Sequence, residues 1–513
     1  MQKKQILNII NFVRAVEPRV PERDMLLPIK EQIRLMKENN LKGTFLLQYD
    51  ALVRPEFTDL FINLDPKQFE LGLWHEIVQP QVEACGLTWR GRFAWDWHTE
   101  CGFSVGYTKK ERELLVDVSF EKFKKIFGFY PKAFGSWFFD TYTARYIESK
   151  YQVDAFCNCK EQFGTDGYTL WGSYYGQGYY PSKNNVFMPA GNKDNQINIP
   201  LFRMLGSDPV YQYDYKLDIS RDKPRNQDVI SLEAVYQDSG KNPDWVKWYM
   251  KENFNGDCLS FGYAQAGQEN AFGWERMGEG ITLQFPYFAK LEKEGKIEIM
   301  QLGETGRWYK EQYSETPPSA ITAHTAYDDE NKSSIWYCTK HFRVNLFADD
   351  GAFRIRDIHI MSDNIADPFE NTVCTEHCAS YETLPFIDGS RYSGKGILAG
   401  GFLTYCDGTI PVFDKMLFKD DGNGCATVCY GNLTISLSEW GIKITGEKPF
   451  VLENRIGLDN AHIPDIIKLE SKTLQLNYLG VDYKIELKQG TFRSEKEMLS
   501  SENVLEFNFK QGE

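Results

Sequence analysis

The sequence predicts an α/β barrel of the (β/α)7 type followed by an all-β sandwich. Strand-like and helix-like segments alternate through the first three hundred residues, which is typical of parallel βαβ units. After about residue 315 the chain changes to short alternating runs separated by turn signals, which is typical of a sandwich. The 513 residues also exceed what one hydrophobic core usually organises, so we expect two domains, 1–318 and 319–513.

The barrel region divides into elements by its hydrophobic periodicity. The expected strands are 6–13, 42–49, 69–76, 133–139, 153–158, 197–205, 230–236 and 259–267. The expected helices are 28–39, 108–126, 141–150, 243–254 and 278–294. The second of these helices has the clearest boundaries, because Thr108 and Glu111 form a capping-box pattern and Gly128 follows its end.

The second domain begins near Glu315, where the sequence SETPPSAIT brings two prolines together. It continues in runs such as SSIWYCTKHFRVNLF and TLQLNYLGVDYKIELKQG, with glycine-rich and aspartate-rich turns between them. None of these runs has convincing helical spacing. We therefore expect antiparallel strands throughout this part.

Composition narrows the possible partners and location. The formal net charge is −14, from 58 Lys and Arg against 72 Asp and Glu, whereas nucleic acids and anionic membranes need clustered positive charge. No apolar run approaches the roughly 18 residues that span a bilayer. The 11 cysteines show no disulfide framework, which favours a reducing compartment. We therefore expect a cytoplasmic protein without a nucleic-acid or membrane partner.

Aromatic residues are abundant and lie in polar surroundings. Phe, Trp and Tyr make up 15% of the chain. Clusters such as Trp89, Trp95 and Trp97 stand among Gly, Ser and Asp rather than in apolar runs. Flat rings with polar edges suit a partner that has one apolar face and one wet face, as a sugar ring does. An oligosaccharide or glycoside is the partner that this pattern predicts.

Polar residues follow the ends of the apolar runs in the barrel region. In a parallel barrel the active site lies at the carboxyl ends of the strands. The candidates are Arg14, Glu17, His75, Glu76, Asp140, Glu161, Gln265, Gln268 and Glu269. Any one of them alone could be a helix cap or a structural hydrogen bond, but their convergence on one edge predicts a site.

Glycoside hydrolysis typically needs two carboxyl groups that face each other across the site. One protonates the leaving oxygen, and the other attacks carbon or activates water. Asp140 ends the run PKAFGSWFFD, and Glu269 follows a glycine-containing strand in YAQAGQENAFGW. We expect Asp140 and Glu269 to form this pair, with carboxyl groups about 5 to 5.5 Å apart if the enzyme is retaining. Asp140 also stands just before a helix, where its alternative role is an N-cap.

Metal binding is the alternative for the histidines and cysteines. His75 and His98 lie near acids, and the sequences CTEHC and CNC offer thiolates, but neither cysteine group has the paired spacing of a zinc site. We therefore predict neither a metal nor another cofactor. His98 lies in the tryptophan-rich loop WDWHTECG, where substrate contact competes with simple loop packing.

Three stretches of the barrel region carry a resemblance. They are GTFLLQYDAL, FELGLWHEIVQP and FGFYPKAFGSWFFD. Their order and spacing resemble the glycoside hydrolase/deacetylase superfamily of (β/α)7 barrels, which includes polysaccharide deacetylases and glycoside hydrolase family 57. The resemblance implies a carbohydrate-active enzyme whose barrel is followed by a β-sandwich.

Departures from the motifs separate the branches of that superfamily. Metal-dependent deacetylases carry an Asp pair after the first strand and His-x-x-x-His on the third, whereas this chain has VRAVEP and has Gln79 four residues after His75. In family 57 the fourth strand ends in Gly-x-Trp-Leu-Pro-Glu, whose carboxylate is the nucleophile, and GSWFFD places Asp140 in that position. The resemblance therefore implies Asp140 as nucleophile and Glu269 as general acid/base. The histidines of that family's first motif are absent, so Arg14 and Glu17 would replace them.

The leading hypothesis is a retaining glycoside hydrolase in which His75, Glu76 and Trp137 shape the sugar subsite. A barrel that binds glycans without catalysis is the second hypothesis, motivated by the missing metal ligands. A carbohydrate deacetylase with unrecognised ligands is the third.

Overall fold

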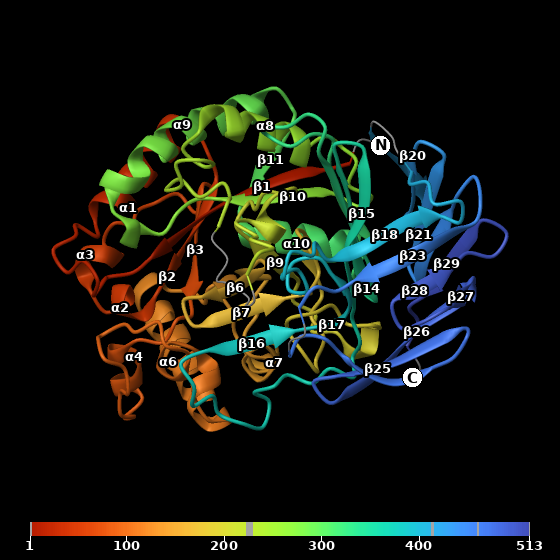
Figure 1. The fold of residues 1–513 in the computed structure, drawn as a ribbon. Helices are drawn as coiled ribbons and strands as arrows, with labels where there is room; N and C mark the ends of the chain where they lie inside the picture. Colours follow the sequence, from red (N-terminus) through yellow and green to blue (C-terminus); the bar gives the residue numbers. More distant parts are fainter. Residues whose placement is uncertain (1–2, 222–228, 412–414, 459–460, 512–513) are drawn as a thin grey trace.

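A computed structural model describes residues 3–221, 229–411, 415–458 and 461–511. Its first half is built on one mainly parallel sheet (Figure 1). The parallel strands are β1 (Gln5–Val13), β2 (Gly43–Leu47), β3 (Phe69–Trp74), β4 (Ala133–Gly135), β5 (Ala155–Cys159), β9 (Leu201–Met204), β10 (Gly262–Ala266) and β11 (Glu298–Met300). They run in the order β10-β1-β2-β3-β4-β5-β9, with β11 also on β1, and β8 (Gly178–Tyr179) continues the sheet antiparallel to β9.

The sheet curves into a nearly closed barrel. The first half of β1 pairs with β10 and β11, and its second half pairs with β2. All nine residues of β1 are buried, as expected for a strand covered on both faces. The predicted α/β barrel fold is confirmed.

Helices cover the outside of the barrel (Figure 1). The longer ones are α1 (Leu27–Glu38), α6 (Lys109–Phe127), α7 (Thr141–Lys150), α8 (Pro243–Asn253), α9 (Trp274–Lys293) and α10 (Leu302–Gln312). Short turns of helix are α2 (Tyr49–Leu52), α3 (Pro55–Thr58), α4 (Gln79–Ala84) and α5 (Thr99–Gly102). Thr108 and Glu111 form the predicted capping box at the start of α6, and Gly128 ends that helix in the left-handed conformation. No helix in the described ranges combines the length and apolarity needed to cross a membrane.

Two expected strands differ from the observed structure. The fourth strand stops at Gly135 rather than continuing to residue 139. Residues 230–236 form turns with one isolated bridge, Ser207 to Ser231, instead of a strand. Leu232 and Ala234 are fully buried, so their apolar character reflects packing against the barrel rather than a ladder of strand pairs.

The second half consists of two large sheets, as the predicted β-sandwich requires. One contains β12 (Ser319–Ala323), β13 (Ser333–Cys338), β14 (Phe342–Asp349), β15 (Ala352–Ile360), β17 (Leu384–Asp388), β18 (Gly400–Tyr405), β23 (Phe450–Arg455), β27 (Thr491–Phe492) and β28 (Glu497–Leu499). The other contains β19 (Met416–Gly422), β20 (Cys425–Tyr430), β21 (Leu433–Ser438), β22 (Gly441–Thr445), β24 (Asp465–Leu469), β25 (Thr473–Tyr478), β26 (Val481–Gln489) and β29 (Val504–Asn508). Every recorded pair within these two sheets is antiparallel.

A small third sheet joins the two halves. The hairpin of β6 (Gln162–Thr165) and β7 (Tyr168–Trp171) leaves the barrel, and β16 (Ala379–Glu382) pairs with β7 in parallel. The two strands lie side by side in Figure 1. The barrel and the β-rich part therefore share a sheet although they are predicted as separate domains.

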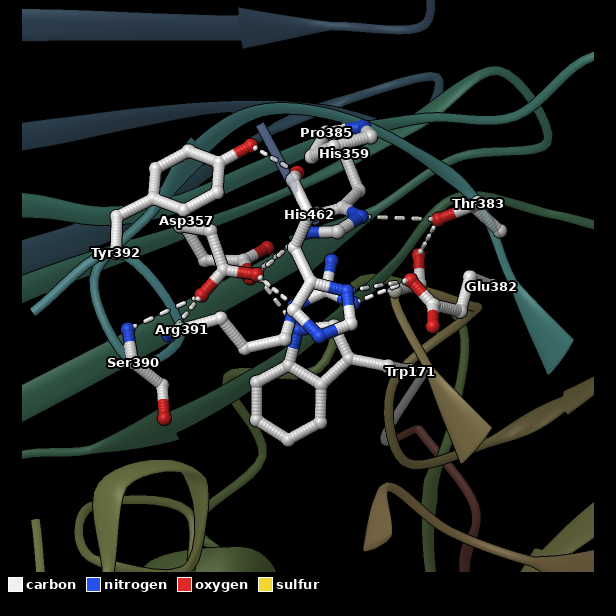
Figure 2. A network of polar contacts seen from close by, with 12 residues as sticks. Trp171, Asp357, His359, Glu382, Thr383, Pro385, Ser390, Arg391, Tyr392 and His462 are labelled. Carbon is white, nitrogen blue, oxygen red and sulfur yellow. Dashed lines mark hydrogen bonds and ion pairs between the residues drawn. The ribbon is translucent and has the colours of Figure 1, made fainter. Parts of the chain in front are cut away.

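A buried polar network reinforces that junction (Figure 2). Asp388 accepts hydrogen bonds from the Trp171 indole and from the Arg391 guanidinium, each at 2.8 Å. Arg391 also pairs with Glu382 at the end of β16. Thr383 donates to the Gly172 carbonyl at 2.7 Å. Because these charged groups are buried and bonded to one another, we interpret the network as structural.

Candidate active site

A cavity of about 370 Å³ opens among residues that follow the carboxyl ends of the barrel strands. Its charged and polar lining residues are Arg14, Glu17, Arg19, Arg23, Gln162, Asp166, Glu233, Glu269 and Arg276. Its aromatic lining residues are Trp137, Tyr168, Tyr236 and Phe272. The position matches the edge where ligands bind in parallel barrels.

Arg14 is the centre of the charged side of this cavity. It follows β1, and its guanidinium is almost fully buried. Its Nη2 lies 3.0 Å from a carboxylate oxygen of Glu76 and 3.1 Å from one of Glu269, and Glu17 approaches its Nη1 at 4.0 Å. The guanidinium also lies 3.9 Å from the ring centre of Trp95. Three carboxyl groups thus lie around one buried cation.

Two of these carboxyl groups, Glu269 and Glu17, have different protonation states. Burial, with the neighbouring Glu76 and Glu17, raises the pKa of Glu269 to about 8 against the opposing pull of Arg14. Burial opposes ionisation of Glu17 as well, but hydrogen bonds from Arg19 lower its pKa below the ordinary value. Arg19 holds both Glu17 oxygens, at 2.8 and 2.9 Å. At neutral pH Glu269 therefore keeps a proton while Glu17 is ionised.

Glu233 is a second lining carboxyl with a raised pKa. It comes from the turn segment 230–236, and burial raises its pKa to about 7. Its oxygens accept hydrogen bonds from Gln268 Nε2 at 3.2 Å and from Ser231 Oγ at 3.3 Å. Two carboxyl groups with pKa values near the physiological range in one cavity can transfer protons in both directions.

Aromatic rings form the other wall of the cavity. Trp137 follows β4 and is packed edge-on against Trp74 with ring centres 5.2 Å apart. Tyr168 begins β7, and Phe272 lies in the turn before α9. A concave site with aromatic walls and a few convergent polar groups is typical of small-molecule and sugar pockets.

Asp140 lies outside the lining of this cavity. Because β4 ends at Gly135, Asp140 stands beyond the strand end and is the N-cap of α7. Its oxygens accept from the Thr143 amide at 2.9 Å and the Thr143 hydroxyl at 2.7 Å. Arg112 pairs with it at 2.8 Å, and this cation and the hydrogen bonds lower its pKa although burial opposes them. The structure thus places Asp140 in the capping role and does not join it to Glu269.

Other predicted site residues are also distributed unevenly. Arg14, Glu17, Trp137 and Glu269 line the cavity, and Glu76 and Gln268 contact lining residues from behind. Four others lie outside the lining: His75, His98, Glu161 and Gln265.

Each of these four has a different environment. Burial lowers the pKa of His75 to about 4, and its Nε2 has no hydrogen-bond partner. Glu161 pairs with Arg203 and Arg343 at 3.5 and 3.1 Å. Gln265 accepts from the Leu205 amide at 2.6 Å. His98 packs against His377 with ring centres 4.1 Å apart.

Some lining residues were not among the predicted ones. Arg19 and Arg23 lie on the loop after β1, several residues beyond the strand end, and Arg276 lies on α9. Glu233 stands within ISLEAVY, which alternates like a strand. A single acidic residue inside an otherwise apolar run was the signal that could have identified it.

One group of potential metal ligands occurs in the described part of the chain: His98, Glu100 and His377. None of the three lines the cavity. The three potential metal ligands therefore belong to a different place than the cavity, whose functional groups are carboxyl, guanidinium and aromatic side chains.

Comparison with solved structures identifies the fold. A structure from Parabacteroides distasonis, named a glycoside hydrolase/deacetylase, matches with a TM-score of 0.57 at 14% identity and covers 75% of this chain and 92% of that one. The chain shares the fold of that structure. No protein-family model and no curated protein matches the sequence.

Two further solved structures match with lower TM-scores. A 4-alpha-glucanotransferase from Thermococcus litoralis matches at 10% identity with a TM-score of 0.33 over 99% of each chain. A family 57 branching enzyme from Thermococcus kodakaraensis matches at 10% identity with a TM-score of 0.31, over 61% of this chain and 72% of that one.

Proposed function

We propose that the protein is a carbohydrate-active enzyme, a glycoside hydrolase that uses Glu269 as its general acid. The observation that carries the proposal is the shared cavity of Glu269 and Glu233, whose pKa values burial raises to about 8 and about 7. A carboxylic acid that stays protonated at neutral pH can donate its proton to a departing glycosidic oxygen. Asp140 is not part of this proposal, because it caps α7.

Glu233 is a better second carboxyl than Glu17. Both oxygens of Glu17 are held by charged hydrogen bonds from Arg19. The oxygens of Glu233 accept only longer bonds, at 3.2 and 3.3 Å, from the neutral groups of Gln268 and Ser231. An ionised Glu233 is therefore freer to attack carbon or to activate water.

The Trp137 ring supports a sugar as the substrate. It projects from the end of β4 into the same cavity as both carboxyl groups. Stacking of a sugar ring on this indole would exclude water from the reacting bond, and exclusion of water strengthens electrostatic interactions with the transition state.

Substitution of the two carboxyl groups tests the proposal. The full chain is incubated with aryl glycosides and oligosaccharides of both anomeric configurations. Glu269→Gln and Glu233→Gln should each lower kcat by about 10²-fold to 10⁴-fold, the usual contribution of a positioned acid or base. Glu22→Gln, an exposed glutamate outside the cavity lining, is the matched control and should leave kcat unchanged.

The pH profile of kcat/KM gives an independent test. Activity should fall below about pH 7 as Glu233 becomes protonated and above about pH 8 as Glu269 loses its proton.

A retained anomeric configuration in the first product would indicate the retaining mechanism. Glycan binding without turnover would instead support a binding barrel, and chelator-sensitive acetate release would support a deacetylase.

A further inference from the structure

The loop with the sequence CTEHC lies against the barrel loop that carries His98. Backbone hydrogen bonds hold the two together: the Thr99 amide donates to the His377 carbonyl at 3.1 Å, and the Cys374 amide donates to the Val105 carbonyl at 2.8 Å. The Ala379 amide donates to the Gly167 carbonyl at 2.9 Å and fixes the other side of the loop. His377 is therefore held in place although its side chain is 71% exposed.

Three side chains converge at this contact. Glu100 Oε1 lies 2.7 Å from His377 Nδ1 and 3.5 Å from His98 Nδ1. One ligand atom from each residue lies within 4.8 Å of the other two. Glu100 Oε2 is buried and has no hydrogen-bond partner. Glu100 Oε1 is therefore the atom that both imidazoles approach.

The spacing suits a transition metal. With bonds of about 2.0 to 2.1 Å, neighbouring ligand atoms in a tetrahedral zinc site lie about 3.3 Å apart. The observed contacts of 2.7 and 3.5 Å bracket that value. The shorter one is a hydrogen bond that a metal would replace. Two imidazoles select zinc-like ions over calcium or magnesium, which take oxygen ligands.

We propose that His98, Glu100 and His377 bind a divalent ion of the zinc class. Two imidazoles and one carboxylate supply three ligands and leave a fourth position open. The metal would join residues 277 positions apart in the sequence, so it would fasten the CTEHC loop to the barrel. This proposal revises the sequence-based expectation of no metal and does not depend on the glycosidase activity proposed above.

The site adjoins a wall of the cavity. His98 follows Trp97, whose ring lies 5.1 Å from the Arg19 guanidinium. Arg19 in turn holds the Glu17 carboxylate. The bound metal would therefore steady a loop that contacts the lining without taking part in the reaction.

Zinc titration of the chelator-treated full chain tests the proposal. We expect one zinc bound per chain by calorimetry, an increase in Tm on binding, and visible absorption bands with cobalt. His98→Ala and His377→Ala should each weaken binding by more than the roughly 10-fold to 100-fold that loss of an outer-shell partner costs. His377 is exposed enough that its substitution should leave the fold intact.

Controls separate this site from adventitious binding. His324→Gln removes a partly exposed histidine paired with Asp257 at 3.1 Å and should leave zinc affinity unchanged. Cys378→Ser removes an exposed thiol of the same loop and should also leave it unchanged. Zinc binding that survives both histidine substitutions, or that is abolished by Cys378→Ser alone, would overturn the proposal.

Discussion

Glu269 and Glu17 carry the same functional group, but their surroundings shift their pKa values in opposite directions. Both contact the buried Arg14, which also pairs with Glu76. Arg19 supplies Glu17 with a second cation, whereas burial dominates at Glu269. The hydrogen bonds from Arg19 therefore help to separate the pKa values of the two carboxyl groups. The position of Arg19, beside Trp95 and Trp97, depends on the tryptophan-rich loop.

Substitution of Asp140 tests whether this residue has a structural role, as the N-cap of α7, or a catalytic one. Asn is also a good N-cap, so Asp140→Asn should preserve the start of α7. The substitution removes the charge that pairs with Arg112 and one of the two acceptor oxygens. A buried cation left without its partner costs about 3 kcal/mol in the free energy of unfolding. Urea unfolding should show this loss, and kcat of the folded variant should stay near that of the unsubstituted protein.

The pH dependence and a control make this test specific. Because the pKa of Asp140 is lowered in the folded state, the stability difference should be full above about pH 4 and should shrink as the pH falls further. Asp154→Asn breaks a half-exposed pair with Arg307 and should cost only about 0 to 1 kcal/mol. A stable Asp140→Asn protein that has lost its activity would restore Asp140 as a catalytic residue.

The sequence predicted strand ends better than side-chain directions. Arg14 and Glu17 come soon after β1 and Glu269 soon after β10, and all three line the cavity. Asp140 was placed beside them because AFGSWFF was predicted as one strand, whereas β4 ends after three residues. Apolar character alone does not distinguish a strand from the buried turn that follows it. The arginines on the loop and on α9 carry no periodic signal at all.

At the scale of elements, the barrel has a seam between β9 and β10, because these strands share no recorded strand pairing. Gln265 on β10 crosses the seam: its Oε1 accepts from the Leu205 amide at 2.6 Å, and its Nε2 donates to the Ala266 carbonyl at 2.8 Å. The side chain thus supplies a hydrogen bond that a strand pair would otherwise provide. The sequence predicted a substrate contact for Gln265. We propose instead that this side chain has the structural role of closing the seam.

Gln265→Leu should therefore weaken the barrel at its seam. The Leu205 amide would be left buried without an acceptor, at a cost of about 1 to 3 kcal/mol in the free energy of unfolding. Hydrogen exchange should become faster at the Leu205 amide, with little change on the opposite side of the barrel. Gln79→Leu, which removes only an exposed bond to Glu83, is the control. Equal stability of both variants would show that the seam does not depend on Gln265.

At the scale of the whole molecule, the two predicted domains are joined by buried interactions. The β7 strand pairs with β16, and the Trp171 indole donates to Asp388. Tyr175 stacks on Trp336 with ring centres 3.8 Å apart. The boundary at 318 and 319 coincides with the start of β12, yet the contacts that follow cross it repeatedly. Such long-range pairing is invisible to local periodicity, which predicts a boundary but not the contacts across it.

A fragment of residues 1–318 should therefore fail to fold as a stable barrel. It would expose the edge of β7 and the face of Tyr175, and it would leave Glu161 without Arg343. The full chain should unfold in one calorimetric transition, because cooperative units are set by shared buried contacts. The fragment should show a broad melt and bind a hydrophobic dye, and addition of residues 319–513 should restore the sharp transition. Two separate transitions in the full chain, with the fragment reproducing one of them, would mean that the barrel folds independently of the sheets that cover it.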